Sequence, residues 1–184
     1  MPNYGKMVVI SGPMYAGKTS EMLKQIFLTR EFETNDIEIF KPTFDNRYSE
    51  TEIVSHNGLR SKAKNIDGPV DPEELTKFIF VDEVQFLDES RFNGDFIQWV
   101  KNLLDMGINV TVSGLNQDWQ GNSFDITAKL MAMADHNIHL SAYCSTCGKP
   151  ALKTYKKSLG GGSVELGATE SYESRCNEHW TYKK

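Results

Sequence analysis

The fold of this chain is decided by the stretch 7-MVVISGPMYAGKT-19. Residues 7–11 form a continuous apolar run, as expected of a strand that is buried on both faces. Residues 12–19 satisfy the pattern G-x-x-x-x-G-K-S/T, and residues 20–32 then carry apolar side chains at helical spacing. A strand, a glycine loop and a helix in this order are typical of a phosphate-binding loop.

Each residue type in this loop has a physical reason. The glycines let the backbone turn so that successive N–H groups face one anion, and the helix N-terminus adds further donors. Lys18 is expected to reach the β- and γ-phosphates, and the Thr19 hydroxyl to ligate Mg²⁺. We therefore predict a site for ATP with magnesium that includes Gly12, Pro13, Met14, Tyr15, Ala16, Gly17, Lys18, Thr19 and Ser20.

Strand and helix patterns alternate after the loop. Strands are expected at 37–41, around Ile53 and Val54, at 78–82, at 108–115 and near 138–143, and helices at about 89–106 and 126–134. This alternation predicts an α/β fold with a mostly parallel sheet flanked by helices. The character of the chain changes after Tyr143, so we expect a nucleotide-binding domain over 1–143 and a small second domain over 144–184.

Two acidic residues end the apolar strand at 78–82. Asp82 occupies a position that holds magnesium, directly or through water. Because the carboxyl ends of parallel strands line the ligand crevice, both acids are expected to face Lys18. Glu83 is then a candidate general base for an attacking hydroxyl. A glutamate here would equally orient water in an ATPase, and position alone leaves both readings open.

Cysteine and histidine form two short-spaced pairs near the end of the chain. Cys144-x-x-Cys147 and Cys176-x-x-His179 have the spacing of a tetrahedral zinc site with three thiolates and one imidazole. Four protein ligands leave no open position, so the zinc is expected to be structural. It would close 148–175 into a clipped loop, and its loss is expected to leave ATP binding at the remote phosphate loop intact.

Composition narrows the classes of protein. The 184 residues carry a net charge of −5, which disfavours a stable nucleic-acid partner. Lys149, Lys153, Lys156 and Lys157 nevertheless form a local basic cluster, so a zinc ribbon that holds nucleic acid is the binding-module alternative. We see no secretory signal and no apolar stretch of the roughly 20 residues that span a membrane, so we expect a cytoplasmic protein without a membrane partner.

Taken together, these motifs resemble the thymidine kinase family of the type with a RecA-like P-loop domain and a zinc-tethered lasso loop. The matching segments are GPMYAGKTS at 12–20, KPTFDNRY at 41–48, FVDEVQF at 80–86, GLNQDWQ at 114–120, CSTCG at 144–148 and VELGATESYESRC with its histidine at 164–179. The resemblance covers nearly the whole chain, and it is more specific than any single motif.

The resemblance implies roles for individual residues. Glu83 would take the proton from the 5′-hydroxyl of the nucleoside, with Gln85 beside it, while Asp45 and Arg47 would lie near the phosphates of ATP and Asp82 near magnesium. The implied thymidine-binding residues are Met14, Phe86, Leu115, Phe124, Thr154, Val164, Glu165, Leu166, Gly167 and Tyr172. Among them, the segment from Val164 to Tyr172 would be the lasso that bonds the thymine edge through its backbone.

The implied activity is transfer of the γ-phosphoryl group of ATP to thymidine, and also to deoxyuridine, for nucleotide salvage. Feedback inhibition by dTTP and a homodimer or homotetramer are further implications of the resemblance. The enzyme alternative is another P-loop ATPase with a structural zinc ribbon. The absence of an N-K-x-D motif disfavours GTP.

Overall fold

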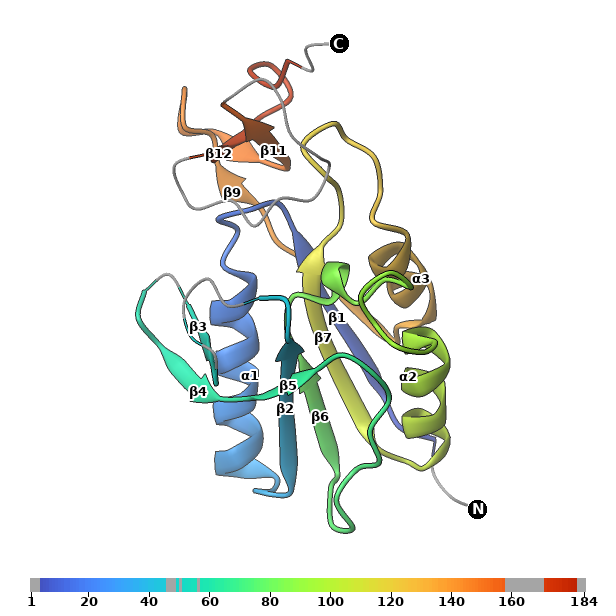
Figure 1. Ribbon diagram of the computed structural model, residues 1–184. Coiled ribbons are helices and arrows are strands. Elements are labelled where there is room, and N and C mark those ends of the chain that lie inside the picture. Colours follow the sequence, from blue (N-terminus) through green and yellow to red (C-terminus); the bar gives the residue numbers. More distant parts are fainter. Residues whose placement is uncertain (1–3, 46–48, 50, 56, 158–170, 182–184) are drawn as a thin grey trace.

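A parallel six-stranded sheet forms the centre of the molecule in the computed structural model, which describes residues 4–45, 49, 51–55, 57–157 and 171–181 (Figure 1). The strand order is β5-β2-β6-β7-β1-β8, and all five pairings are parallel. The strands are β1 (Met7–Gly12), β2 (Ile37–Pro42), β5 (Lys64–Ile66), β6 (Phe78–Val81), β7 (Asn109–Leu115) and β8 (His136–His139). The α/β fold class is therefore confirmed.

Helices cover both faces of this sheet. α1 (Lys18–Phe32) lies on one face, and α2 (Phe96–Asp105) and α3 (Asp125–Met133) lie on the other (Figure 1). Side chains of β6 alternate between the two layers: Phe80 packs in the α1 layer with Met22, while Ile79 packs in the α2 layer with Trp99. Burial on both faces explains why β1 and β6 are mostly apolar.

Small antiparallel pairs lie outside the main sheet. β3 (Glu52–Val54) pairs with β4 (Arg60–Lys62) next to α1. β9 (Ala142–Tyr143) pairs with β10 (Pro150–Ala151), and β11 (Lys153–Lys156) pairs with β12 (Tyr172–Arg175). We call residues 142–157 and 171–181 the zinc element. It lies beyond the carboxyl ends of the central strands (Figure 1).

Two of the expected elements have different bounds in the structure. The helix expected over 89–106 begins only at Phe96, because the Asp95 side chain caps it by accepting from Gln98 N–H at 3.0 Å. The strand expected near 138–143 is two strands: β8 ends at His139, and β9 belongs to a different sheet. In the part of the chain that is described, no helix is long and apolar enough to span a membrane.

A buried carboxylate fastens one edge of the sheet. Glu38 on β2 is 6% exposed and accepts hydrogen bonds from Lys64 Nζ (2.8 Å), Glu73 N–H (3.0 Å) and Thr76 Oγ1 (2.9 Å). Burial opposes ionisation of Glu38, but these hydrogen bonds and the Lys64 charge outweigh it and lower the pKa of Glu38 below its ordinary value. Glu38 therefore ties β2 to β5 and to 73–76 in its charged form.

Replacement of Glu38 by Gln is expected to lower the free energy of unfolding at pH 7 by about 1–3 kcal/mol, because charged hydrogen bonds are lost from a buried site. Since the folded-state pKa is depressed, this stabilisation is complete above the unfolded pKa of about 4.3 and is lost as pH falls through the folded pKa. Urea unfolding of both proteins at neutral and acid pH measures the difference. A difference that does not shrink in acid would contradict the ionic role.

Candidate active site

The phosphate-binding loop joins β1 to α1 and needs glycine at both ends. Gly17 adopts φ 83° as the residue that caps α1, a conformation that favours glycine. A Cβ atom on Gly12 would lie 2.5 Å from the carbonyl oxygen of Leu140. The loop is therefore pressed against the chain that leaves β8.

A pocket of about 410 Å³ lies along this loop. It is lined by Met14, Tyr15, Ala16, Gly17, Lys18, Thr19, Ser20, Val54, Asn57, Glu83, Leu115, Ser141, Ala142 and Tyr143. Lys18 is 9% exposed, and its ammonium donates to Pro13 O at 2.8 Å. Most of the predicted phosphate-site residues therefore share one pocket with Glu83 and Leu115, while Val54, Asn57 and 141–143 were missed by sequence reasoning.

Asp82 lies at the carboxyl end of β6 and is 4% exposed. Its carboxylate accepts hydrogen bonds from Thr19 Oγ1 at 3.0 Å, from Glu83 N–H at 3.0 Å and from the Ser113 hydroxyl. Burial and the neighbouring Glu83 carboxylate raise the pKa of Asp82 to about 6, although its hydrogen bonds act in the opposite direction. A divalent cation would favour the ionised form, and the oxygens of Thr19 and Asp82 are of the type that Mg²⁺ prefers.

Glu83 follows directly and has a strained backbone, with φ 56° and ψ 40° in the left-handed region. Gln85, which is 1% exposed, donates from its side-chain amide to the Glu83 carboxylate. The side-chain carbonyl oxygen of Gln85 accepts a hydrogen bond from Leu115 N–H at 2.9 Å. A Cβ atom on Gly114 would lie 2.8 Å from that carbonyl oxygen. Gln85 therefore links Glu83 to β7 and orients its carboxylate.

A smaller cavity of about 40 Å³ adjoins these acids. Its lining residues are Thr19, Lys41, Asp45, Glu52, Ile53, Val54, Asp82 and Glu83. Asp45, which is 8% exposed, thus lines the same cavity as the two strand-end acids. Lys41 was missed, although it stands at the carboxyl end of an apolar strand just as Asp82 does, and that position is the signal that could have found it.

The remaining predicted residues are more scattered. Phe86 is 3% exposed and packs edge-on against Phe44, with ring centroids 5.5 Å apart. Phe124 precedes α3, and its N–H donates to Asn116 O at 3.1 Å. Thr154 and Tyr172 lie in the zinc element. The predicted residues outside the described part of the chain are Arg47, Val164, Glu165, Leu166 and Gly167.

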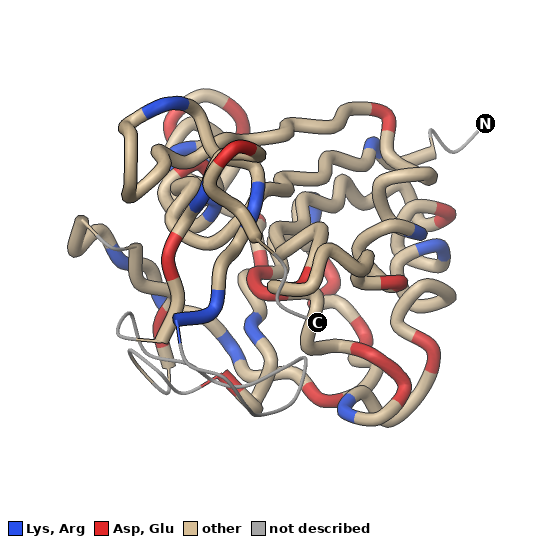
Figure 2. Tube along the Cα trace, turned by 90° about the horizontal axis from the view of Figure 1, so that it is seen from above, with Lys and Arg blue, Asp and Glu red and all other residues tan. Residues whose placement is uncertain are grey.

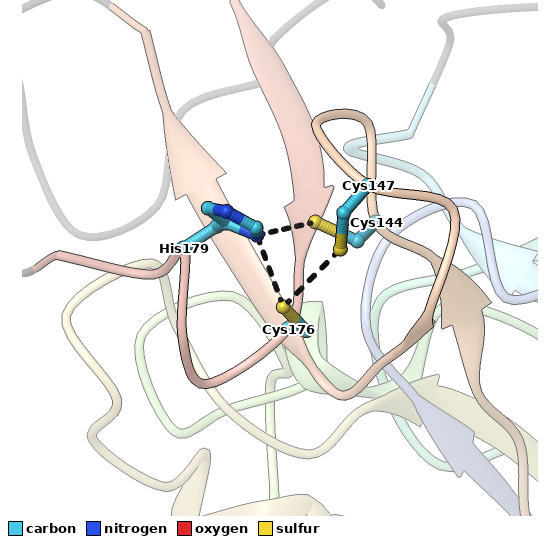
Figure 3. A group of neighbouring side chains, drawn as sticks. All are labelled: Cys144, Cys147, Cys176 and His179. Atoms are coloured by element: carbon cyan, nitrogen blue, oxygen red, sulfur yellow. Dashed lines mark hydrogen bonds between the residues drawn. The ribbon is translucent and has the colours of Figure 1, made fainter.

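The four predicted zinc ligands converge on one point (Figure 3). Their ligand atoms lie within 4.8 Å of one another, with Cys147 Sγ and Cys176 Sγ 3.8 Å apart and Cys176 Sγ 3.3 Å from His179 Nδ1. A tetrahedral zinc with Zn–S bonds of about 2.3 Å would separate two sulfurs by about 3.8 Å. The cluster can therefore hold zinc.

The electrostatic setting of the cluster also suits a metal. Burial disfavours the Cys144 thiolate, but backbone N–H groups of Cys176, Thr146 and Cys147 outweigh it and lower the pKa of Cys144 to about 5. The thiolate is the form that ligates metals. Arg175 donates to the carbonyl oxygen of His179 at 3.1 Å, which fixes the turn that carries this ligand.

The zinc element contacts the phosphate loop directly. Met14 N–H donates to Thr154 Oγ1 at 3.1 Å, and Met14 O accepts from Ser174 Oγ at 2.7 Å. The Tyr15 hydroxyl donates to Tyr172 O at 3.2 Å. The expectation that the phosphate loop is remote from the zinc element is therefore wrong, because the two are joined at the loop tip.

Comparisons with known proteins agree with this geometry. The family model for thymidine kinase matches residues 5–180. A curated relative from Thermococcus kodakarensis, named thymidine kinase, is 39% identical over 190 aligned positions, which cover 95% of this chain and 93% of the relative. The chain belongs to the thymidine kinase family.

Proposed function

We propose that this protein transfers the γ-phosphoryl group of ATP to the 5′-hydroxyl of thymidine, giving dTMP and ADP, and that deoxyuridine is a second substrate. One observation carries the proposal beyond family membership. A glutamate held by a buried glutamine lies at the same pocket as a complete phosphate-binding loop. Such a base is suited to activate a hydroxyl next to a γ-phosphate.

The proposed roles of the residues are based on their positions. Lys18 and the loop N–H groups bind the phosphates, and Thr19 and Asp82 would hold Mg²⁺, which neutralises phosphate charge when bound. Glu83 accepts the proton of the 5′-hydroxyl as its oxygen attacks the γ-phosphorus. The bond to the β–γ bridging oxygen breaks, and ADP leaves. Asp45 and Arg47 are proposed to lie beside the phosphates.

The nucleoside is proposed to occupy the space between Glu83 and the zinc element. The proposed contacts are Met14, Phe86, Leu115, Phe124, Thr154, Val164, Glu165, Leu166, Gly167 and Tyr172. The hydrogen bond between Met14 and Thr154 supports this arrangement, because it brings two of these residues together. A fixed pattern of donors and acceptors would reject rings with the opposite pattern.

Zinc is proposed to be structural and to clip the base of a lasso over 148–175. The division into 1–143 and 144–184 remains a proposal, as do feedback inhibition by dTTP, a homodimer or homotetramer, and a cytoplasmic location. Seen from above, the chain carries acidic as well as basic positions (Figure 2). In the zinc element, Lys149 is paired with Glu178 at 3.0 Å and Arg175 is paired with Glu173, which gives little support to nucleic-acid binding.

The test is incubation with Mg-ATP and a panel of nucleosides, with detection of monophosphates. Thymidine should give dTMP, and ADP release should depend on added thymidine. An ATPase would release ADP at the same rate without any nucleoside, and that outcome would overturn the proposed acceptor.

Replacement of Lys18 by Ala is expected to lower kcat by roughly 10²–10³-fold, because the transferring group loses a positive charge. Thr19→Ala should raise the Mg²⁺ concentration needed for half-maximal rate, because a proposed ligand is removed. Steady-state kinetics across a magnesium titration measure both effects. Serine at position 19 keeps the hydroxyl, so Thr19→Ser serves as the control and should stay near wild type.

A further inference from the structure

Lys41, at the carboxyl end of β2, is a buried cation that the reaction described above does not use. It is 4% exposed. Its ammonium donates to the carbonyl oxygen of Ser49, and this is its only hydrogen bond within the described part of the chain. An ammonium has three donors, and burial of its charge beside a neutral acceptor alone is unfavourable. The site therefore suits a further, anionic acceptor.

The sheet places Lys41 beside the proposed magnesium ligand. β2 and β6 are parallel neighbours with Phe40 opposite Val81, and Asp82 N–H donates to Phe40 O at 3.0 Å. Lys41 and Asp82, the residues that follow this pair, therefore lie side by side at the carboxyl ends of adjacent strands. Both line the 40 Å³ cavity, together with Thr19 and Glu83.

The residues that line this cavity include those proposed to surround the γ-phosphate. In the proposed reaction the γ-phosphate would contact a magnesium ion bound by Thr19 and Asp82, and it would face the hydroxyl that Glu83 activates. Among the described lining residues, four are acidic and Lys41 alone is basic. One of the acids, Glu52, is already paired with Arg60 at 3.3 Å. A triphosphate would add negative charge to this set, and Lys41 is positioned to offset it.

We propose that Lys41 donates a hydrogen bond to a non-bridging oxygen of the γ-phosphate of ATP and stabilises the charge on that group during transfer. Lys41 stays protonated throughout and forms no covalent bond. It would thus be a second catalytic cation beside Lys18. The proposal rests on the proposed function for the identity of the acceptor, but the predicted contact with ATP does not require thymidine.

A competing role is purely structural, in which the bond to Ser49 fixes the segment that follows β2. The two roles differ in which nucleotide they affect. A contact with the γ-phosphate strengthens binding of a triphosphate but not of ADP. A structural role changes both affinities alike, or neither.

The experiment compares Lys41→Gln, Lys41→Arg and the control Lys101→Gln, which removes an exposed lysine from α2. Calorimetry without nucleoside measures Kd for Mg-ADP and for the β,γ-imido analogue of Mg-ATP. Lys41→Gln is expected to raise the Kd for the analogue by roughly 10–100-fold and to leave the Kd for ADP nearly unchanged. Lys41→Arg should keep most of the affinity because it keeps the charge, and Lys101→Gln should match wild type.

Turnover of Lys41→Gln with thymidine should fall by roughly 10²–10³-fold. An equal loss of affinity for both nucleotides, or no loss for either, would overturn the proposal, and a lowered melting temperature with the equal loss would identify the structural role. The binding and turnover measurements also distinguish a failure of this inference from a failure of the proposed function. If wild type fails to produce dTMP, the acceptor is wrong, while the contrast between the two nucleotides still tests Lys41.

Discussion

Replacement of Glu83 by Gln is expected to lower kcat for thymidine phosphorylation by roughly 10²–10⁴-fold while Mg-ATP affinity stays within a few-fold of wild type. Glutamine has nearly the same shape, and its carbonyl can still accept the hydrogen bond from Gln85. It cannot take a proton from the 5′-hydroxyl. The strained backbone at this position is retained in both proteins, so the loss would report the chemistry rather than the fold.

Steady-state kinetics and nucleotide calorimetry on the same preparations measure this prediction. Glu89→Gln is the matched control, because Glu89 is an exposed glutamate close to Glu83 in sequence and lies outside the two active-site cavities. It should behave as wild type. Near-normal kcat in the folded Glu83 variant would show that this carboxylate is not the general base. Asp45, which lines the same small cavity, would then be the next candidate.

The residues that sequence reasoning placed well are those whose role depends on local pattern. The phosphate loop needs only its glycines, Lys18 and Thr19 between a strand and a helix. Asp82 and Glu83 could be placed because the carboxyl ends of buried parallel strands meet at one edge. Zinc ligands are found by spacing alone. Each of these signals is carried by residues that are close together in the sequence, and in the zinc site by two such pairs.

What was missed depends on contacts between distant segments. Lysine is ordinarily exposed, so the burial of Lys41 could not be predicted without knowing that β2 pairs with β6 and that the Lys41 ammonium bonds to Ser49. Residues 141–143 reach the phosphate pocket because β8 is the neighbour of β1, and local periodicity does not encode strand order. Phe92 continued the helical pattern at 89–106, yet in the structure it lies in the loop before α2 and packs from there against Phe96 and Trp99.

Replacement of Cys176 by Ser is expected to lower the bound metal from about one zinc per chain to a small fraction and to lower the melting temperature. Thymidine affinity should fall, because the proposed lasso is no longer clipped at its base. The affinity for ATP should fall as well, by several-fold. The hydrogen bonds between the zinc element and residues Met14 and Tyr15 hold the tip of the phosphate loop, and the loss of zinc would loosen both partners.

Elemental analysis, thermal unfolding and separate titrations with thymidine and Mg-ATP measure these effects. Ser145→Ala, an exposed change between two ligands, controls for substitution in the same turn and should keep its zinc. Chelation of the wild-type metal should reproduce the Cys176→Ser values, and the variant should respond little to chelator. Native stability in metal-free protein would rule out a structural zinc. Loss of thymidine binding with unchanged ATP affinity would instead show that the phosphate loop keeps its shape without its bonds to Thr154 and Ser174.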